Sequence, residues 1–111
     1  MYVARFSYAI TPVDRDRALA LLQQEVTAAR EQGMDARLLV PLTRAVGGAS
    51  LHYEIVLASL DTLESFREQG IGGEAGTRSW MRELSALLLE PPAVELLRVA
   101  DASNAADNAP R

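Results

Sequence analysis

The sequence contains no cysteine and no lysine, and it has only one histidine, His52, and one tryptophan, Trp80. Without cysteine the chain can form no disulfide framework, no thiolate metal site and no cysteine nucleophile. All 11 basic side chains are arginines, against 15 acidic ones, which leaves a formal net charge of -4. An acidic chain without a basic cluster argues against duplex nucleic acid and against an anionic membrane surface as partners.

Long apolar runs are also missing from the sequence. Runs built only of alanine and leucine, such as Ala18–Leu22 and Ala86–Leu89, fall far short of the ~20 apolar residues that a membrane-spanning helix needs. Residues 1–10 alternate in character and carry Arg5 in the middle, which differs from the pattern of a secretory signal peptide. We therefore expect a cytoplasmic protein that has no membrane partner.

The length of 111 residues suits one domain with one core, and we assign that domain to residues 1–100. Residues 101–111 offer almost nothing to bury, so we predict a disordered C-terminal tail. Alanine, leucine, arginine and glutamate make up almost half of the chain, a composition typical of a long helix or coiled coil. Segments rich in β-forming residues interrupt every helical pattern, which argues against that structure.

The sequence alternates between β-forming and helical segments. The first helix begins at Thr11-Pro12, where threonine can cap and proline fits the first turn, and it ends at Gly33. Pro41 cannot donate to a ladder, so its strand belongs at an edge of the sheet. Gly47-Gly48, within the loop 45–49, is typical of a hairpin loop. The predicted strands span 2–10, 35–44, 50–59 and 93–100, and the predicted helices span 12–32, 61–70 and 74–90.

This order of elements, β-α-β-β-α-β, predicts an α+β ferredoxin-like plait, in which one four-stranded antiparallel sheet carries both helical regions on one face. The other face should be polar in a monomer. However, Leu38–Val40 and Leu96-Leu97 make their strands apolar on both sides. The uncovered face then needs a second cover, and a second copy of the chain is the simplest one. We therefore expect a homodimeric α+β barrel; the tail or a different protein are the alternative covers.

The stretch Tyr53–Val99 resembles the second half of the dimeric α+β barrel superfamily, and most of all its small bacterial NIPSNAP-like and antibiotic-biosynthesis-monooxygenase-like proteins. The shared features are a strand ending in Ser59-Leu60, a short helix with a central Phe66, a helix bearing Trp80, and a final strand after Pro91-Pro92. This superfamily includes cofactor-independent monooxygenases, polyketide cyclases, isomerases, haem-degrading enzymes and ligand-sensing modules. The resemblance therefore implies the fold and leaves the activity open.

His52 is the candidate proton-transfer residue, because histidine titrates near neutral pH and suits a general base. Strand parity points its side chain away from the helices, together with Glu54. Arg5 and Ser7 have the corresponding parity on the first strand, which neighbours the third strand in this topology. Glu54 would orient His52, and Arg5 would hold a carboxylate or enolate oxygen. The alternative is that Arg5 and Glu54 form only a cross-strand ion pair at the dimer interface.

Apolar side chains around these polar groups are typical of a ligand pocket. The residues that we predict to line it are Ser7, Leu39, Val56 and Trp80. For Trp80 an alternative stays open, because Leu84 and Leu88 share its helical stripe and favour a place in the core.

The segment Gly70–Thr77 contains a G-x-G-x-x-A pattern. It follows a helix rather than a strand, in a chain too short for a Rossmann domain, which argues against a nucleotide site. A kink between helices or a lid over the barrel mouth are the other interpretations. One histidine and no cysteine leave carboxylates as the other metal ligands, and no spacing matches a calcium loop. Haem ligation by His52 lacks an accompanying motif, so we predict no metal and no cofactor.

Two functional hypotheses follow. The first is a homodimeric α+β barrel protein whose cavity binds a small, mostly apolar metabolite. The second is a cofactor-independent monooxygenase, cyclase or isomerase acting on an aromatic or polyketide-like substrate, with His52 as base. The Asn/Trp/Tyr constellation of the monooxygenases has no match here, so no catalytic residue is transferred from them. A ligand-sensing module would need a partner, because 111 residues already spent on the plait leave no room for a DNA-binding half.

Overall fold

The computed structural model describes residues 1–43, 47–62 and 73–100, and from residue 79 onwards the side chains of α3 as well. The elements along the chain are β1 (Tyr2–Tyr8), a 3-10 turn η1 (Pro12–Asp14), α1 (Arg15–Glu31), β2 (Asp35–Leu39), β3 (Leu51–Leu57), α3 (Gly73–Ser85) and β4 (Ala93–Arg98). Most of the helix predicted at 61–70, with Phe66, and the tail predicted at 101–111 lie outside the described residues, as do residues 70–72 of the glycine-rich segment 70–77.

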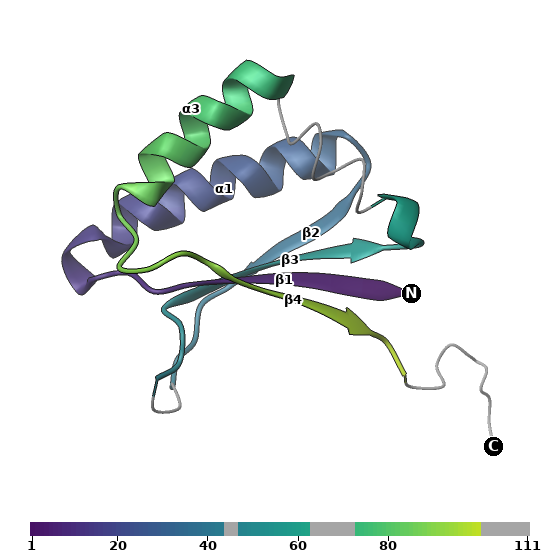
Figure 1. The fold of residues 1–111 in the computed structure, drawn as a ribbon, viewed down its shortest axis with the longest axis horizontal. Helices are drawn as coiled ribbons and strands as arrows, with labels where there is room; N and C mark the ends of the chain where they lie inside the picture. Colours follow the sequence, from purple (N-terminus) through teal and green to yellow (C-terminus); the bar gives the residue numbers. More distant parts are fainter. Residues whose placement is uncertain (44–46, 63–72, 101–111) are drawn as a thin grey trace.

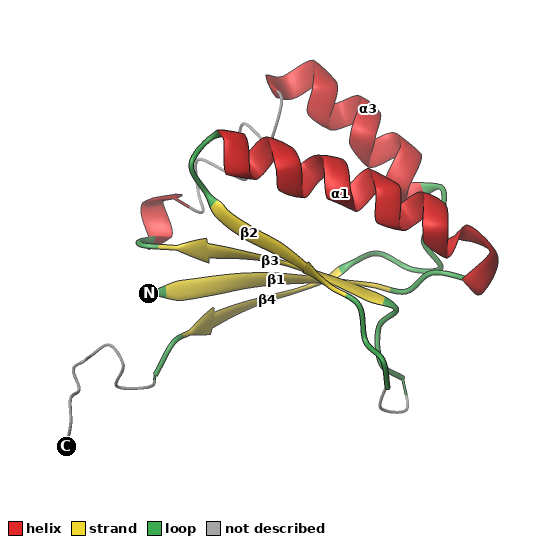
Figure 2. Ribbon diagram, turned by 180° about the vertical axis from the view of Figure 1, so that it is seen from behind, coloured by secondary structure: helices red, strands yellow, loops and turns green. Residues whose placement is uncertain are grey.

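The described strands form one antiparallel sheet in the order β2-β3-β1-β4. Helices α1 and α3 both lie on one face of this sheet, and the opposite face carries no helix of the described chain (Figures 1 and 2). This is the predicted ferredoxin-like arrangement. The chain termini of the described part also lie together, since the Val99 N–H donates to the Met1 carbonyl at 3.0 Å.

The strands are shorter than predicted, and β2 shows why. It lies at an edge, as Pro41 indicates, but it ends at Leu39 instead of continuing to residue 44. Proline has no N–H to offer a ladder, so pairing stops before it. The last helix is also shorter than predicted, because Leu88 forms a β-bridge with Ile10 and the Leu89 N–H donates to the Ala9 carbonyl at 2.9 Å.

Both ends of α1 reflect local sequence chemistry. At its C-terminus Gly33 has a φ of +84°, and the Gly33 and Met34 N–H groups donate to the carbonyls of Arg30 and Ala29 at 2.9 and 3.0 Å. These bonds make a Schellman motif, which confirms the predicted glycine cap. At the other end the prediction was wrong in detail, because the Thr11 hydroxyl donates to the Asp14 carboxylate at 3.2 Å rather than capping a backbone N–H.

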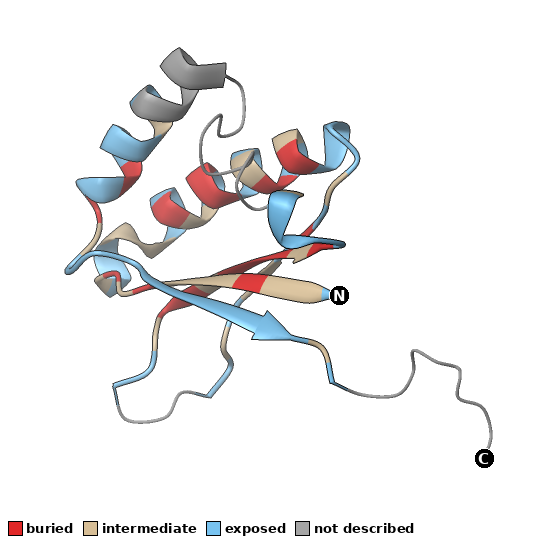
Figure 3. Cartoon of the chain, turned by 45° about the vertical axis from the view of Figure 1, so that its right-hand side comes forward, coloured by how far each residue is buried: buried red, intermediate tan, exposed pale blue. Residues whose placement is uncertain are grey.

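The core lies between the helices and the sheet, as the buried segments of α1 and the strands show (Figure 3). The predicted parity of the third strand is confirmed, because every second residue from Leu51 to Leu57 is buried. Helix α3 contributes less cover than α1, and it slants away from the sheet toward its N-terminal end (Figure 1). The buried apolar side chains of α1 are Ala18, Leu21, Leu22, Val26 and Ala29.

Candidate functional site

The helix-free face of the sheet carries three rows of side chains that cross all four strands. The middle row alternates in charge and consists of Arg37, Glu54, Arg5 and Glu95, which are aligned across β2, β3, β1 and β4. We call these four residues the charged row. The rows beside it are Asp35, Val56, Val3 and Leu97 on one side, and Leu39, His52, Ser7 and Ala93 on the other.

Glu54 is the centre of the charged row. Although it lies on the helix-free face, it is only 1% exposed, because two arginine side chains enclose its carboxylate. Arg5 Nε donates to Oε2 at 2.7 Å, and Arg37 donates to Oε1 through Nη2 at 2.8 Å and through Nε at 3.0 Å. Burial alone would raise the pKa of Glu54, but the hydrogen bonds and charges of Arg37 and Arg5 outweigh it and lower that pKa. Glu54 is therefore a fixed carboxylate.

His52 and Ser7 form the polar pair of the neighbouring row. The Ser7 Oγ and the His52 Nδ1 are 2.9 Å apart and share a hydrogen bond whose direction depends on the tautomer. Both residues are half-buried. Because this contact occupies Nδ1, the ring nitrogen that remains for a contact with a ligand or another chain on the helix-free face is Nε2.

The predicted catalytic and pocket residues are thus divided between two faces. Ser7 and Leu39 lie in the same row as His52 on the helix-free face, and Val56 lies on that face on the other side of the charged row. Trp80 does not join them, because it lies in α3 on the other side of the sheet, where its Nε1 donates to the Leu21 carbonyl at 2.7 Å. Its packing against the core corresponds to the alternative interpretation from its helical stripe.

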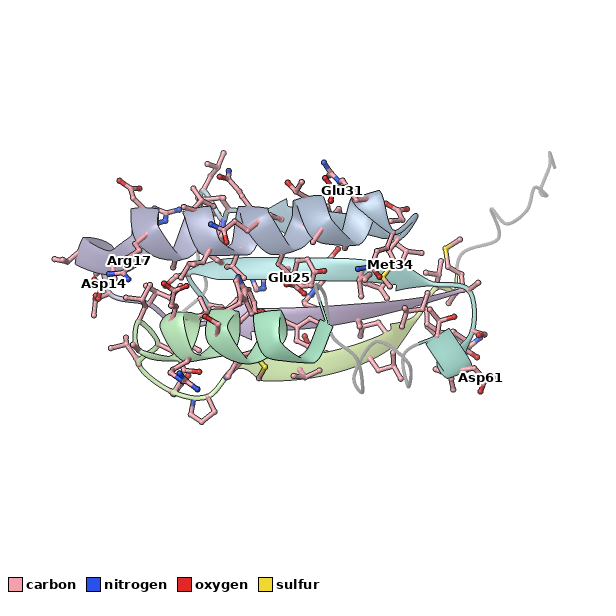
Figure 4. The ribbon with its side chains drawn as sticks, turned by 90° about the horizontal axis from the view of Figure 1, so that it is seen from above. Asp14, Arg17, Glu25, Glu31, Met34 and Asp61 are labelled. Atoms are coloured by element: carbon pink, nitrogen blue, oxygen red, sulfur yellow. The ribbon has the colours of Figure 1, made fainter. Side chains whose placement is uncertain are left out.

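A second group of titratable side chains lies between the sheet and the helices, and its member Glu25 was missed by sequence reasoning. Tyr8 and Tyr53 are buried on the helix-covered face, and Glu25 of α1 is half-buried close to both. Seen from above the helices, Glu25 lies on the side of α1 that faces α3 (Figure 4). Burial raises the pKa of Glu25 from 4.5 to about 7. Burial and the Glu25 charge also raise the pKa of Tyr53 above its ordinary value.

Tyr53 is the most confined member of this group. It is 2% exposed, and its hydroxyl has no hydrogen-bond partner within residues 1–43, 47–62 and 73–100. A signal for Glu25 did exist in the sequence. Glu25 follows Leu21 by four residues and Leu22 by three, which places it on the buried stripe and not on the wet side of the helix.

Comparison with solved structures identifies the class of fold. An antibiotic biosynthesis monooxygenase has a TM-score of 0.69 at 16% identity, covering 91% of this chain and 100% of that one. A NIPSNAP domain protein from Burkholderia xenovorans has a TM-score of 0.70 at 16% identity, covering 90% and 95%. A protein from Mycobacterium tuberculosis has a TM-score of 0.65 at 21% identity, covering 91% and 97%. No protein-family model and no curated protein sequence matches the chain.

The chain therefore has the ferredoxin-like α+β fold of antibiotic-biosynthesis-monooxygenase-like and NIPSNAP proteins. At these levels of identity the similarity shows the fold, while function has to be argued from the site. In the part of the chain that the structure describes, no cluster of acidic and histidine side chains could hold a metal ion. No helix within the described ranges is long and apolar enough to cross a membrane.

Proposed function

We propose that this protein is a cytoplasmic homodimer that stacks two helix-free sheet faces and binds a small, mostly apolar organic molecule between them. The charged row is the observation that carries the proposal. Four charges of alternating sign cross the sheet, with apolar side chains such as Val3, Val56 and Leu97 beside them. Leu97 is 37% exposed in the single chain, and a second sheet would cover it.

The charged row is complementary to itself in one orientation of the two copies. A two-fold axis between the sheets and parallel to the strands keeps each row over the same row but reverses the order of the strands. Arg37 then lies over the partner's Glu95, and Glu54 over the partner's Arg5. An axis across the strands would instead place Arg37 over the partner's Arg37. Unlike charges favour the first arrangement, which agrees with the nearly aligned strands of face-to-face sheets.

The ligand would lie beside the charged row, where apolar and polar groups converge. Leu39 offers an apolar surface in the same row as the Ser7–His52 pair, which offers one polar contact, and Val56 offers a second apolar surface on the other side of the charged row. A mostly apolar wall with few polar groups is the usual form of a small-molecule site. Because Arg5 and Arg37 already saturate Glu54, this carboxylate positions the two guanidinium groups and does not itself act as an acid.

The Ser7–His52 hydrogen bond also favours a second candidate function, a cofactor-independent monooxygenase, cyclase or isomerase acting on an aromatic or polyketide-like substrate. Ser7 would fix the ring, His52 Nε2 would accept a proton, and Arg5 would stabilise the resulting oxyanion. In this case His52→Ala removes turnover of such a substrate, whereas Ser7→Ala only slows it. Equal turnover by wild type and His52→Ala contradicts the assignment.

The dimer is tested by light scattering coupled to size exclusion, with a matched pair of substitutions. Leu97→Arg places a new charge among the apolar side chains beside the charged row and should convert a wild-type dimer to a monomer. Leu89→Arg makes the same change at an exposed position outside this face and should leave the dimer intact. A monomeric wild type at micromolar concentration, or equal behaviour of the two variants, contradicts the proposal.

A further inference from the structure

A hollow opens beyond one end of the sheet, where the loop before η1 meets the loop between β2 and β3. Both loops lie at the end of the molecule opposite the N-terminus of the chain (Figure 1). The hollow has a volume of about 290 Å³, close to the lower limit for small-molecule sites. Its described lining residues lie outside the strands and are Ile10, Pro12, Arg15, Pro41, Leu42 and Ser50.

Ser50 fixes the inner wall of the hollow. Its hydroxyl accepts a hydrogen bond from the Ile10 N–H at 3.1 Å and donates one to the Ile10 carbonyl at 3.0 Å, while its own N–H donates to the Tyr8 carbonyl at 2.8 Å. Both Ser50 and Ile10 are buried. These bonds tie the residue before β3 to the chain that follows β1, so the wall is already in place before a ligand arrives.

Arg15 is the cation among the described lining residues. It is half-buried, and its guanidinium makes no ion pair and no hydrogen bond with the described side chains. The carboxylate of the preceding residue, Asp14, accepts a hydrogen bond from the Thr11 hydroxyl at 3.2 Å, and Asp16 is exposed to solvent, which screens its charge. A guanidinium binds a carboxylate through two parallel N–H groups. A single cation balances a monoanion, whereas a phosphate dianion would need further donors.

The other walls of the hollow favour an apolar ligand body. Pro12 and Pro41 offer rigid rings and no N–H group to a ligand. Leu42 is 98% exposed in the single chain, so its side chain has apolar surface to bury against a molecule that enters the hollow. The combination of one cation with apolar walls excludes a strongly hydrated ligand and suits an amphipathic one.

We propose that this hollow binds a small carboxylic acid with an apolar body, whose carboxylate pairs with Arg15 and whose body packs against the two prolines and Leu42. All the described lining residues belong to one chain, and none of them belongs to the charged row or to the Ser7–His52 pair. The site is therefore distinct from the one proposed between two copies, and binding does not depend on dimerisation.

Cyclohexanecarboxylate and cyclohexanecarboxamide provide a matched pair of probes, because they share one ring and differ in charge. Their affinities for the intact protein are measured by ligand-observed NMR at neutral pH and low salt. We expect wild type to bind the carboxylate about tenfold more tightly, the effect of a hydrogen-bonded charge pair. Arg15→Gln should reduce this ratio to about one, while Arg17→Gln, which removes the same charge outside the hollow, should preserve it. Leu42→Ser should weaken binding of both probes by about threefold.

The location is checked independently of these variants by intermolecular NOEs from the carboxylate probe to the assigned methyl groups of Ile10 and Leu42. Circular dichroism verifies that Arg15→Gln is folded. Equal affinity of wild type for the two probes, no binding of either, the same ratio in Arg15→Gln as in Arg17→Gln, or NOEs only to residues elsewhere would each overturn the proposal. The Leu97→Arg variant should bind both probes as wild type does, and light scattering on the same samples reports separately on the dimer.

Discussion

A glutamate on each side of the sheet is shielded from solvent, but the pKa is lowered on one side and raised on the other. On the helix-free face Glu54 is nearly inaccessible, yet two arginines hold its carboxylate and lower its pKa. On the helix-covered face Glu25 is only half-buried, but burial acts without a compensating cation from the described side chains and raises its pKa to about 7. The comparison shows that pairing, rather than depth, decides whether burial of a carboxylate favours its charged form.

The largest expected loss of stability comes from removing one of the two arginines that pair with Glu54. Arg5→Ala leaves Glu54 buried with Arg37 alone, and removal of one member of a buried pair typically costs several kcal/mol. Because Arg5 is partly exposed and Arg37 remains, we expect a loss of about 2–3 kcal/mol in the free energy of unfolding, measured by urea denaturation. Arg17→Ala, on the exposed side of α1, is the control and should change it by less than about 0.5 kcal/mol. Equal losses in both variants contradict the role assigned to Arg5.

A smaller effect is expected from Glu25. Its contribution to stability falls as the pH rises, whereas that of a paired carboxylate such as Glu54 increases with pH. Since the pKa of Glu25 is raised in the folded state, its contribution to stability is fully present below about pH 4.5 and is lost as the pH rises through about 7. Solvent screening of a half-buried group limits this loss to about 1–2 kcal/mol. Glu25→Gln should abolish this decline in the free energy of unfolding between about pH 4.5 and 8, whereas Glu31→Gln on the exposed side of α1 should retain it. A wild-type stability that rises over this range contradicts the assignment.

The smallest effect compares one hydroxyl from each face. Ser7→Ala removes the hydrogen bond to His52 and should lower the free energy of unfolding by about 1 kcal/mol. Tyr53→Phe removes a hydroxyl that has no partner in the described chain, so it should leave stability unchanged or raise it slightly. Thermal or urea unfolding of both variants measures the difference, and a larger loss in Tyr53→Phe than in Ser7→Ala would reverse the conclusion.

Much of the fold could be predicted because its signals are local. Strand parity gave the buried side of β3, and Gly33 marked the end of α1. The contact between Arg5 and Glu54 also follows from parity once β1 and β3 are neighbours. The second partner of Glu54, Arg37, could not be predicted in the same way, because the register of β2 against β3 depends on the loop between them and on packing.

The surroundings of Trp80 and of the Tyr53 hydroxyl could not be predicted, because they come from distant elements. The sequence predicts Trp80 in one pocket with Ser7, yet the packing of α3 on α1 places it on the other side of the sheet. The charge of Glu25 suggests an exposed position, but its angle around the helix, which it shares with the buried stripe, is the better guide to burial. The unpaired state of the Tyr53 hydroxyl depends on every neighbour at once, and no local pattern reports it.

The bond between the Trp80 indole and the Leu21 carbonyl has a practical consequence. It joins α3 to α1 at 2.7 Å, and Trp80 is the sole tryptophan of the chain. Tryptophan emission from this protein therefore originates at one helix–helix contact, without labelling. The emission wavelength therefore reports whether α3 remains packed against α1. Separation of the two helices can be followed in time as the protein is heated, diluted or titrated.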